Sequence, residues 1–579
     1  MSHRDVDFDY DFIVVGSGFG GSVSALRLTE KGYRVAVMEM GRRWTPDNLP
    51  RTNWSIRRFF WHPGLSLRGF FSMRFFRHVV ILHGCAVGGG SITYANTLLV
   101  PPEHVWDSGA WAGLADWHGE MPAHYRTASR MLGVIENRIL GPGDRLLQRA
   151  ADAAGVGHTF YRTSVGVFQP PEGEPGGKTY PDPYFGGEGP ARTTCIGCGG
   201  CMVGCRHGAK NSLDQNYLYL AERRGAEVFP ETRVVQIRPL DGKEDGRGGY
   251  EVRTVNSLSA WDRRPRRFTC RGVVFAASSL GTMELLFKLK ESGSLPAVSE
   301  RLGDLVRTNS ESLIGVRVPG SGEDLSMGVA IGSGIYLDEH THIEATRYPA
   351  GSDAMSCLTT MLTGGRPGPL RVALWLKNVA TSFVRHPIRT MRILNPVGSA
   401  RESVILLCMQ ALEGHIDMRW RRKLTWPFRK TLVSSGRKIP TFIPQANDFA
   451  EKLAKLAGGT AMSLIPEILF DIPGTAHCLG GCVIGDSPES GVVDSQHRLF
   501  GYRNAYVCDG SVVAANLGVN PSLTITALAE RAMTFIPPAS TTSWDDGALS
   551  DAAVVYDSGS PAVPAAEESP SSVSTHSAK

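Results

Sequence analysis

The chain has 579 residues, 42 % of them hydrophobic, and a formal net charge of +5. This length predicts a large buried core in two or more domains, and the mild basic bias, without an RNP-type or helix-turn-helix motif, gives no indication of nucleic-acid binding. Eleven cysteines are too few for a disulfide scaffold of a chain this long.

The N-terminal segment predicts a nucleotide-binding βαβ unit. The apolar run 10–15 is typical of a buried parallel strand, 22–32 has helical periodicity, and 33–40 predicts the next strand. A G-x-G-x-x-G turn lies between the first strand and the helix, where backbone N–H groups and the helix dipole favour a pyrophosphate, and an acid ends the second strand, where it can bind a ribose. The predicted nucleotide contacts are Gly16, Gly18, Phe19, Gly20, Gly21 and Glu39.

Further along, 271–277 and 505–509 predict strands, and 280–291 and 522–533 predict helices. The segment 311–471 looks irregular, with short strands and two basic helices. From residue 537 onward Ser, Ala, Pro and Glu dominate, which predicts a disordered tail at 537–579.

The N-terminus has no charged, apolar and small-residue pattern of a signal peptide, and no apolar stretch reaches about 18 residues. We therefore expect a cytoplasmic protein. Two stretches rich in aromatic and basic residues, 54–80 and 419–431, suit peripheral contact with an anionic membrane. The alternatives are a wall of the substrate cavity for the first stretch and a solvated helix for the second.

Three later motifs decide what kind of nucleotide protein this is. They are the glycine-rich loop 84–91 (GCAVGGGS), the run 477–482 (HCLGGC), and Asp509-Gly510-Ser511 followed by 516–521 (NLGVNP). In this combination and order the chain resembles the glucose–methanol–choline (GMC) family of FAD oxidoreductases, and within it the cholesterol oxidases. The resemblance covers about residues 8–536.

The resemblance implies an α/β fold (α+β overall), in which a Rossmann-like FAD-binding domain is joined to a substrate-binding domain of a mixed sheet plus helices. The implied FAD-binding domain is discontinuous and comprises 8–48, 76–110, 205–310 and 472–536. The implied substrate-binding domain and insertions comprise 49–75, 111–204 and 311–471.

The resemblance also implies roles for matching positions. The loop at Gly84, Gly88, Gly89, Gly90 and Ser91 would lie along the pyrophosphate and isoalloxazine, although Cys85 stands where the family has Arg. Val234 would pair with adenine through its backbone. The remaining implied contacts with the cofactor are Asp509 and Gly510 beside the ribityl–phosphate region, and Asn520 and Pro521.

The implied reaction is oxidation of a bulky secondary alcohol, most simply a sterol 3β-hydroxyl, with hydride passing to FAD and then to O₂. His477 and Asn520 would hold the substrate hydroxyl. Asp353 falls in the place of the glutamate that shifts the sterol double bond, with Glu344 as the weaker candidate. The alternatives are a dehydrogenase of another hydrophobic alcohol with a different acceptor, and an electron-transfer flavoprotein without its own alcohol.

Cys195, Cys198, Cys201 and Cys205 form C-x₂-C-x₂-C-x₃-C, a spacing found in ferredoxins. Iron–sulfur ligation, zinc ligation and structural or redox-sensitive thiols all stay open. The cluster is not favoured, because four ligands from one short run are awkward and no second run of this spacing is present. If a cluster binds, its fourth ligand is Cys205 or a distant thiol such as Cys478 or Cys482.

Overall fold

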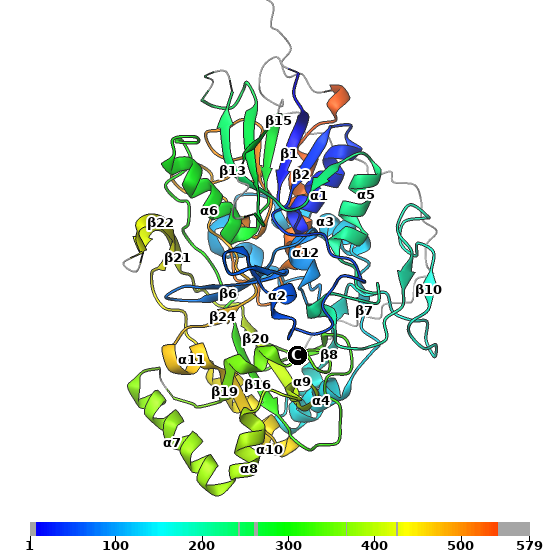
Figure 1. Ribbon diagram of the computed structural model, residues 1–579, viewed down its shortest axis with the longest axis vertical. Helices are drawn as coiled ribbons and strands as arrows, with labels where there is room; N and C mark the ends of the chain where they lie inside the picture. Colours follow the sequence, from blue (N-terminus) through cyan, green and yellow to red (C-terminus); the bar gives the residue numbers. More distant parts are fainter. Residues whose placement is uncertain are drawn as a thin grey trace, which may run out of the picture.

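The computed structural model describes residues 7–240, 242, 244–259, 264–365, 367–423 and 426–541. The predicted tail lies outside these residues from position 542 onward. Two seven-stranded sheets organise the described chain, one in the upper and one in the lower half of Figure 1.

The first sheet contains the predicted βαβ unit. Its strand order is β12-β2-β1-β15-β14-β13, with β25 also paired to β15. Pairing is parallel from β12 to β15 and antiparallel from β15 to β13, so that Val14 stands between Val37 and Val274. The strands are β1 (Tyr10–Val15), β2 (Val35–Met38), β12 (Glu227–Phe229), β13 (Thr232–Pro239), β14 (Tyr250–Asn256), β15 (Arg266–Phe275) and β25 (Ala505–Val507).

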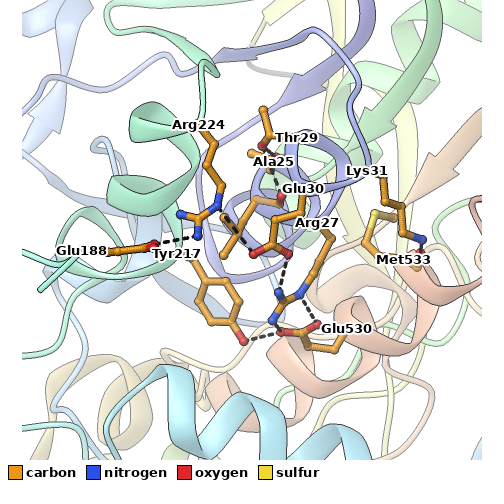
Figure 2. A network of polar contacts seen from close by, with 11 residues as sticks. Ala25, Arg27, Thr29, Glu30, Lys31, Glu188, Tyr217, Arg224, Glu530 and Met533 are labelled. Carbon is orange, nitrogen blue, oxygen red and sulfur yellow. Dashed lines mark hydrogen bonds and ion pairs between the residues drawn. The ribbon is translucent and has the colours of Figure 1, made fainter. Parts of the chain in front are cut away.

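Helices from distant parts of the chain pack together beside this sheet. α1 (Phe19–Glu30) contacts α5 (Tyr217–Arg223) and α12 (Ser522–Thr534), and α12 contacts α3 (Trp117–Met131). Figure 2 shows the polar centre of this packing, where Glu530 accepts hydrogen bonds from Arg27 Nε (2.7 Å) and from the Tyr217 hydroxyl (2.5 Å). These bonds tie the first helix of the chain to the last. α6 (Ser278–Glu291) packs against β13.

The second sheet is antiparallel throughout, with the order β19-β23-β16-β20-β18-β17-β8. α10 packs against β16 and α4 against β17, which closes a second hydrophobic core. These elements are β8 (Tyr161–Arg162), β16 (Ser312–Arg317), β17 (Ile331–Tyr336), β18 (Thr341–Thr346), β19 (Thr359–Met361), β20 (Ser403–Gln410), β23 (Thr460–Leu464), α4 (Pro142–Ala153) and α10 (Pro444–Ala457).

The remaining elements are short or peripheral. The helices are α2 (Ile56–Phe59), α7 (Pro369–Arg385), α8 (Pro387–Leu394), α9 (Ser399–Glu402) and α11 (Ile465–Phe470). The strands are β3 (Trp61–His62), β4 (Leu67–Arg68), β5 (Phe71–Phe75), β6 (Val80–Gly84), β7 (Ile135–Glu136), β9 (Ser164–Val165), β10 (Thr179–Tyr180), β11 (Arg192–Thr193), β21 (Asp417–Lys423), β22 (Trp426–Ser435) and β24 (Gly474–Thr475).

The expected fold class is confirmed, and two local predictions are wrong. The segment 311–471 supplies most of an ordered sheet, because its strands alternate with helices and loops that hide the period-two pattern in sequence. The stretch 419–431 lies in the β21–β22 hairpin and is not a helix. The domain boundaries stay a prediction.

No helix in the described part of the chain has the length and apolarity that a membrane crossing requires.

Candidate active site

The glycine turn after β1 leaves no room for side chains where it packs against neighbouring backbone. A Cβ at Gly20 would lie 1.6 Å from the Cys508 carbonyl oxygen, and one at Gly21 would lie 2.1 Å from that of Gly16. Gly16 itself has φ +102°, in the left-handed region that favours glycine. Gly18 differs, because a Cβ there would meet nothing within 4 Å. The open side of the turn therefore suits a pyrophosphate at the N-terminus of α1.

The second glycine loop lies directly against the first. A Cβ at Gly89 would be 2.4 Å from the Gly18 Cα, so only glycine permits this approach. The Gly88 N–H donates to the Ser17 hydroxyl oxygen at 3.0 Å. Ser91 fixes the loop from within, since its hydroxyl donates to the Gly88 carbonyl at 2.6 Å. Two segments far apart in sequence thus form one cradle.

Glu39 follows β2 and reaches the same turn. Its carboxylate accepts bonds from the Gly41 N–H (2.7 Å) and from the Ser17 N–H (3.1 Å) and hydroxyl (2.8 Å). Burial raises the pKa of Glu39 although these bonds favour the charged form. Val234 lies nearby on β13, since the Thr232 N–H donates to the Glu39 carbonyl at 2.8 Å. This arrangement leaves the Glu39 carboxylate placed for the ribose of a dinucleotide.

One cavity of about 350 Å³ joins the glycine cradle to the second sheet. Residues of the two glycine loops and of the C-terminal segment line it next to the cradle. Apolar side chains, most of them from the second sheet, line its far end together with some polar ones such as Arg317 and Ser463. The residues on the cradle side include Gly18, Phe19, Gly84, Gly90, Asp509, Gly510 and Pro521. Those on the far side include Phe71, Leu313, Ile331, Met355, Ile405, Leu407 and Met462.

His477 faces this cavity and is paired with a buried carboxylate that sequence reasoning missed. Its Nδ1 contacts a carboxylate oxygen of Glu311, and the other oxygen accepts the Ala476 N–H at 2.9 Å. Burial lowers the pKa of His477, but the charges of Glu311 and, further away, Glu344 outweigh it, so the pKa is raised. With Nδ1 engaged, Nε2 is the nitrogen left for a ligand in the cavity.

Asn520 lies in the same cavity and binds a second buried carboxylate. Its side-chain N–H donates to Glu344 Oε2 at 3.1 Å, and Glu344 sits in the middle of β18 with a fully buried side chain. Burial raises the pKa of Glu344 to about 8, despite the opposing effects of Asn520 and His477. The Asn520 Oδ1 and Glu344 Oε1 atoms are buried without a hydrogen-bond partner. Glu344 can therefore hold or release a proton near neutral pH.

Asp353 is placed differently. It precedes the short 3₁₀ turn Ala354–Leu358, and its carboxylate accepts the backbone N–H groups of Gly398 (3.1 Å) and Ala400 (2.8 Å). Neither Asp353 nor Glu344 lines the cavity itself, but Glu344 binds Asn520 and its charge acts on His477, and both of these residues line the cavity. The structure therefore brings Glu344, and not Asp353, to His477 and Asn520.

The four clustered cysteines line a separate cavity of about 180 Å³. Neither Cys478, which lines the larger cavity, nor the buried Cys482 reaches it, so the idea of a distant thiol as fourth ligand is wrong. Within the described ranges, no three His, Cys, Asp or Glu side chains come together closely enough to hold a single metal ion.

Comparisons with known proteins agree with this geometry. Residues 433–529 match a family model described as GMC oxidoreductase, and 14–45 match one described as NAD(P)-binding Rossmann-like domain. A cholesterol oxidase of Acinetobacter baumannii is 60 % identical over 92 % of this chain and 95 % of its own length. A cholesterol oxidase of Mycobacterium tuberculosis is 48 % identical over 91 % of each chain. Pyridoxine 4-oxidase from Mesorbium loti has a TM-score of 0.56 at 15 % identity, covers 90 % of this chain and 98 % of its own, and shows the fold alone.

These matches span both halves of the molecule. The glycine cradle fits FAD, because its open face at Gly18, the Glu39 carboxylate and the adjoining cavity supply the surroundings that a flavin dinucleotide needs. The chain is an FAD-dependent oxidoreductase acting on CH–OH donors. It belongs to the GMC oxidoreductase family, in the cholesterol oxidase branch.

Proposed function

We propose that the chain oxidises the 3β-hydroxyl of cholesterol or a related sterol to the 3-ketone and passes the electrons to O₂, giving H₂O₂. The observation that carries this proposal is the single cavity in which His477 and Asn520 lie between the flavin cradle and an apolar wall. Apolar walls of this kind suit a bulky hydrophobic alcohol better than a sugar. The names of the two similar oxidases support the same substrate class.

The proposed chemistry assigns each paired side chain one task. FAD, when bound, accepts the hydride from the carbinol carbon. Neutral His477 takes the hydroxyl proton at Nε2, and the Glu311 carboxylate at Nδ1 stabilises the imidazolium that forms. Asn520 orients the hydroxyl from the other side while its amide stays bound to Glu344. The buried surroundings exclude water from these groups.

We assign the shift of the sterol double bond to Glu344 in place of Asp353. Moving the bond requires a carboxylate that removes a ring proton and returns it to another carbon. Glu344 has a free oxygen beside the cavity residue Asn520, and its pKa of about 8 lets it exchange a proton near neutral pH. Both oxygens of Asp353 are held by backbone N–H groups.

Peripheral membrane docking is the second part of the proposal, through the α7–α8 hairpin. The two helices project from the lower end of the molecule in Figure 1. Their exposed apolar side chains include Leu370 (86 % exposed), Val384 (84 %) and Ile388 (83 %). The segment 369–394 carries Lys and Arg but no Asp or Glu, which suits an anionic lipid surface.

The position of the hairpin supports a route for sterol. Cavity-lining residues stand just before it (Met355, Thr359) and just after it (Ser399, Ala400). By contrast, the aromatic stretch 54–80 is divided: Phe59 and Phe70 are fully buried in a core cluster, whereas Trp54, Leu65 and Phe75 are exposed. Of this stretch only Phe71 lines the cavity, so it offers a less continuous apolar surface than the hairpin.

The sterol assignment is tested by mixing purified holoenzyme with cholesterol. Anaerobically, the flavin absorbance should bleach, and in air H₂O₂ should form in amounts equal to the 3-ketone. Failure of every 3β-hydroxysterol to bleach the flavin would overturn the sterol proposal. Bleaching without peroxide would overturn the O₂ part and favour a dehydrogenase with another acceptor.

Docking is tested by co-sedimentation with phosphatidylglycerol vesicles at low salt. The double variant V384D/I388D should lose binding, because each charge replaces an exposed apolar contact. L65D is the matched control, since Leu65 is 68 % exposed in the other aromatic and basic stretch. Equal binding of the hairpin variant and wild type would refute docking through α7–α8.

A further inference from the structure

The cysteine run folds around a common space. Gly197 (φ +65°), Gly199 (φ +67°) and Gly204 (φ +80°) adopt left-handed backbone conformations that curl the segment 195–205. As a result Cys195, Cys198, Cys201 and Cys205 all line the cavity of about 180 Å³. One short run can therefore present all four thiols to the same cavity.

The charge around this cavity suits an anionic occupant. Arg51, Arg206 and Lys210 line it, and no Asp or Glu does. Lys210 is almost fully buried, and its Nζ donates to the carbonyl oxygens of Cys201 (2.8 Å) and Ile92 (2.9 Å). A group ligated by four thiolates carries net negative charge, which such a rim offsets.

Reactive or redox-sensing thiols are a poorer explanation of the same residues. Such thiols have a depressed pKa and are exposed. Here Cys195 and Cys201 are buried, and Cys198 and Cys205 are half-buried. Four thiols that line one internal cavity suit ligation of a metal group better than reaction with an external partner.

Mononuclear zinc and a polynuclear cluster need different spacing of their ligands. In the described chain no three candidate ligand side chains are close enough for one ion, which disfavours mononuclear zinc. A polynuclear cluster keeps its thiolates farther apart, around its own volume. The Gly197 N–H also donates to Cys195 Sγ at 3.4 Å, a bond of the kind that stabilises cluster sulfur.

We propose that the chain binds an iron–sulfur cluster in this cavity, with Cys195, Cys198, Cys201 and Cys205 as ligands. The site adjoins the flavin cavity, since Met202 lines the larger cavity while its neighbour Cys201 lines the smaller one. Lys210 joins the two sites, because its Nζ donates to the carbonyl oxygens of Cys201 and of Ile92 and Tyr94, which directly follow the second glycine loop. Binding of the cluster does not depend on which alcohol the enzyme oxidises.

The test is metal analysis of the full chain purified anaerobically with its flavin. We expect about four iron atoms and about four acid-labile sulfides per chain, and a paramagnetic signal after reduction with dithionite. If less than about a tenth of an iron atom per chain is found both before and after anaerobic reconstitution with iron and sulfide, the proposal is overturned. Stoichiometric zinc without sulfide would overturn it as well.

Variants locate the cluster. C198A and C205A should lose iron and sulfide in parallel, and these half-buried positions disturb packing less than the buried Cys195 and Cys201. C357A is the matched control, because Cys357 is exposed and remote from the run in sequence, and it should retain wild-type iron. Full iron in both C198A and C205A would refute these ligands. Should either variant fail to fold, the iron and sulfide content of the wild-type chain still decides the proposal.

Discussion

Glu344 and Asp353 are both buried carboxylates of the second half of the molecule, yet their surroundings differ. One carboxylate oxygen of Glu344 accepts a hydrogen bond from the Asn520 amide, and the other has no hydrogen-bond partner. By contrast, both carboxylate oxygens of Asp353 accept hydrogen bonds from backbone N–H groups near α9. Burial alone therefore does not mark a functional carboxylate. What distinguishes the two is whether the scaffold already uses the acceptor atoms. Glu311 and Glu344 each bind a side chain that lines the cavity, His477 or Asn520, and form the cavity-facing class. Asp353 binds backbone N–H groups and Asp144 binds the buried Arg347, and these two form the scaffold class.

The cavity-facing class is tested most severely at His477, the partner of Glu311. H477Q should lower kcat by about 10²–10⁴-fold, because the neutral amide that replaces the imidazole beside Glu311 cannot take the hydroxyl proton. Steady-state assays with flavin absorbance as the measure of folding check this. H118Q is the control, because the His118 side chain is 50 % exposed, and it should leave kcat unchanged. If H477Q lowers kcat by less than about tenfold, Glu311 would be assigned to the scaffold class.

The scaffold class is tested most severely at Asp144. Its carboxylate pairs with both terminal nitrogens of Arg347 (2.6 and 2.7 Å) with neither side chain exposed. D144N should lower the free energy of unfolding by about 3–5 kcal/mol, since it leaves the Arg347 charge buried and unpaired. Urea titration measures the free energy of unfolding. The control is E188Q, which removes one partner of the exposed Arg224–Glu188 pair and should change this free energy little. Equal midpoints for D144N and wild type would contradict the assignment.

The two carboxylates themselves form a matched pair of variants. E344Q should lower the yield of the 3-oxo-Δ4 product relative to 3-oxo-Δ5 by at least about tenfold, because the amide cannot carry the ring proton. D353N should leave that ratio unchanged but lower the free energy of unfolding by about 1–3 kcal/mol through its lost backbone bonds. Product chromatography and urea titration separate the effects. If D353N lowers the ratio of the two products and E344Q does not, Asp353 and not Glu344 moves the double bond.

The smallest expected effect is a shift of the pH profile. His477 accepts a proton only when neutral, so kcat/KM should rise with pH through its raised pKa. E311Q removes the main charge that raises this pKa, and the rising limb should then move to lower pH, with a lower plateau. The double-bond shift should rise separately through about pH 8 as Glu344 ionises. An unmoved limb in E311Q would show that Glu311 does not act on His477.

The same contrast explains what the sequence could predict. The first strand and the glycine turn were predictable because the period of the apolar residues and the glycine spacing are local signals, and β1 falls on the expected residues. His477 and Asn520 were found through motifs that surround them. Their placement in one cavity agrees with the expectation, while their catalytic roles stay predictions.

The missed features depend on contacts between distant segments. Glu311 has no motif around it and gains its place only because the chain returns at Ala476. Glu344 was ranked below Asp353, since alternation along β18 does not reveal which carboxylate meets Asn520. Two basic helices were predicted within 311–471, but the exposure of the apolar side chains on α7 and α8 depends on tertiary packing and was not predicted.

The network of Arg27, Tyr217 and Glu530 has a consequence for synthesis of the chain. Arg27 is made early, whereas Glu530 on α12 emerges from the ribosome about five hundred residues later. Until then α1 lacks its contact with α12, and β15 lacks its parallel neighbour β25. Asn520 and Pro521, which line the cavity, belong to the same late segment. The N-terminal nucleotide-binding unit and the cavity therefore depend on contacts that only the last part of the fold supplies.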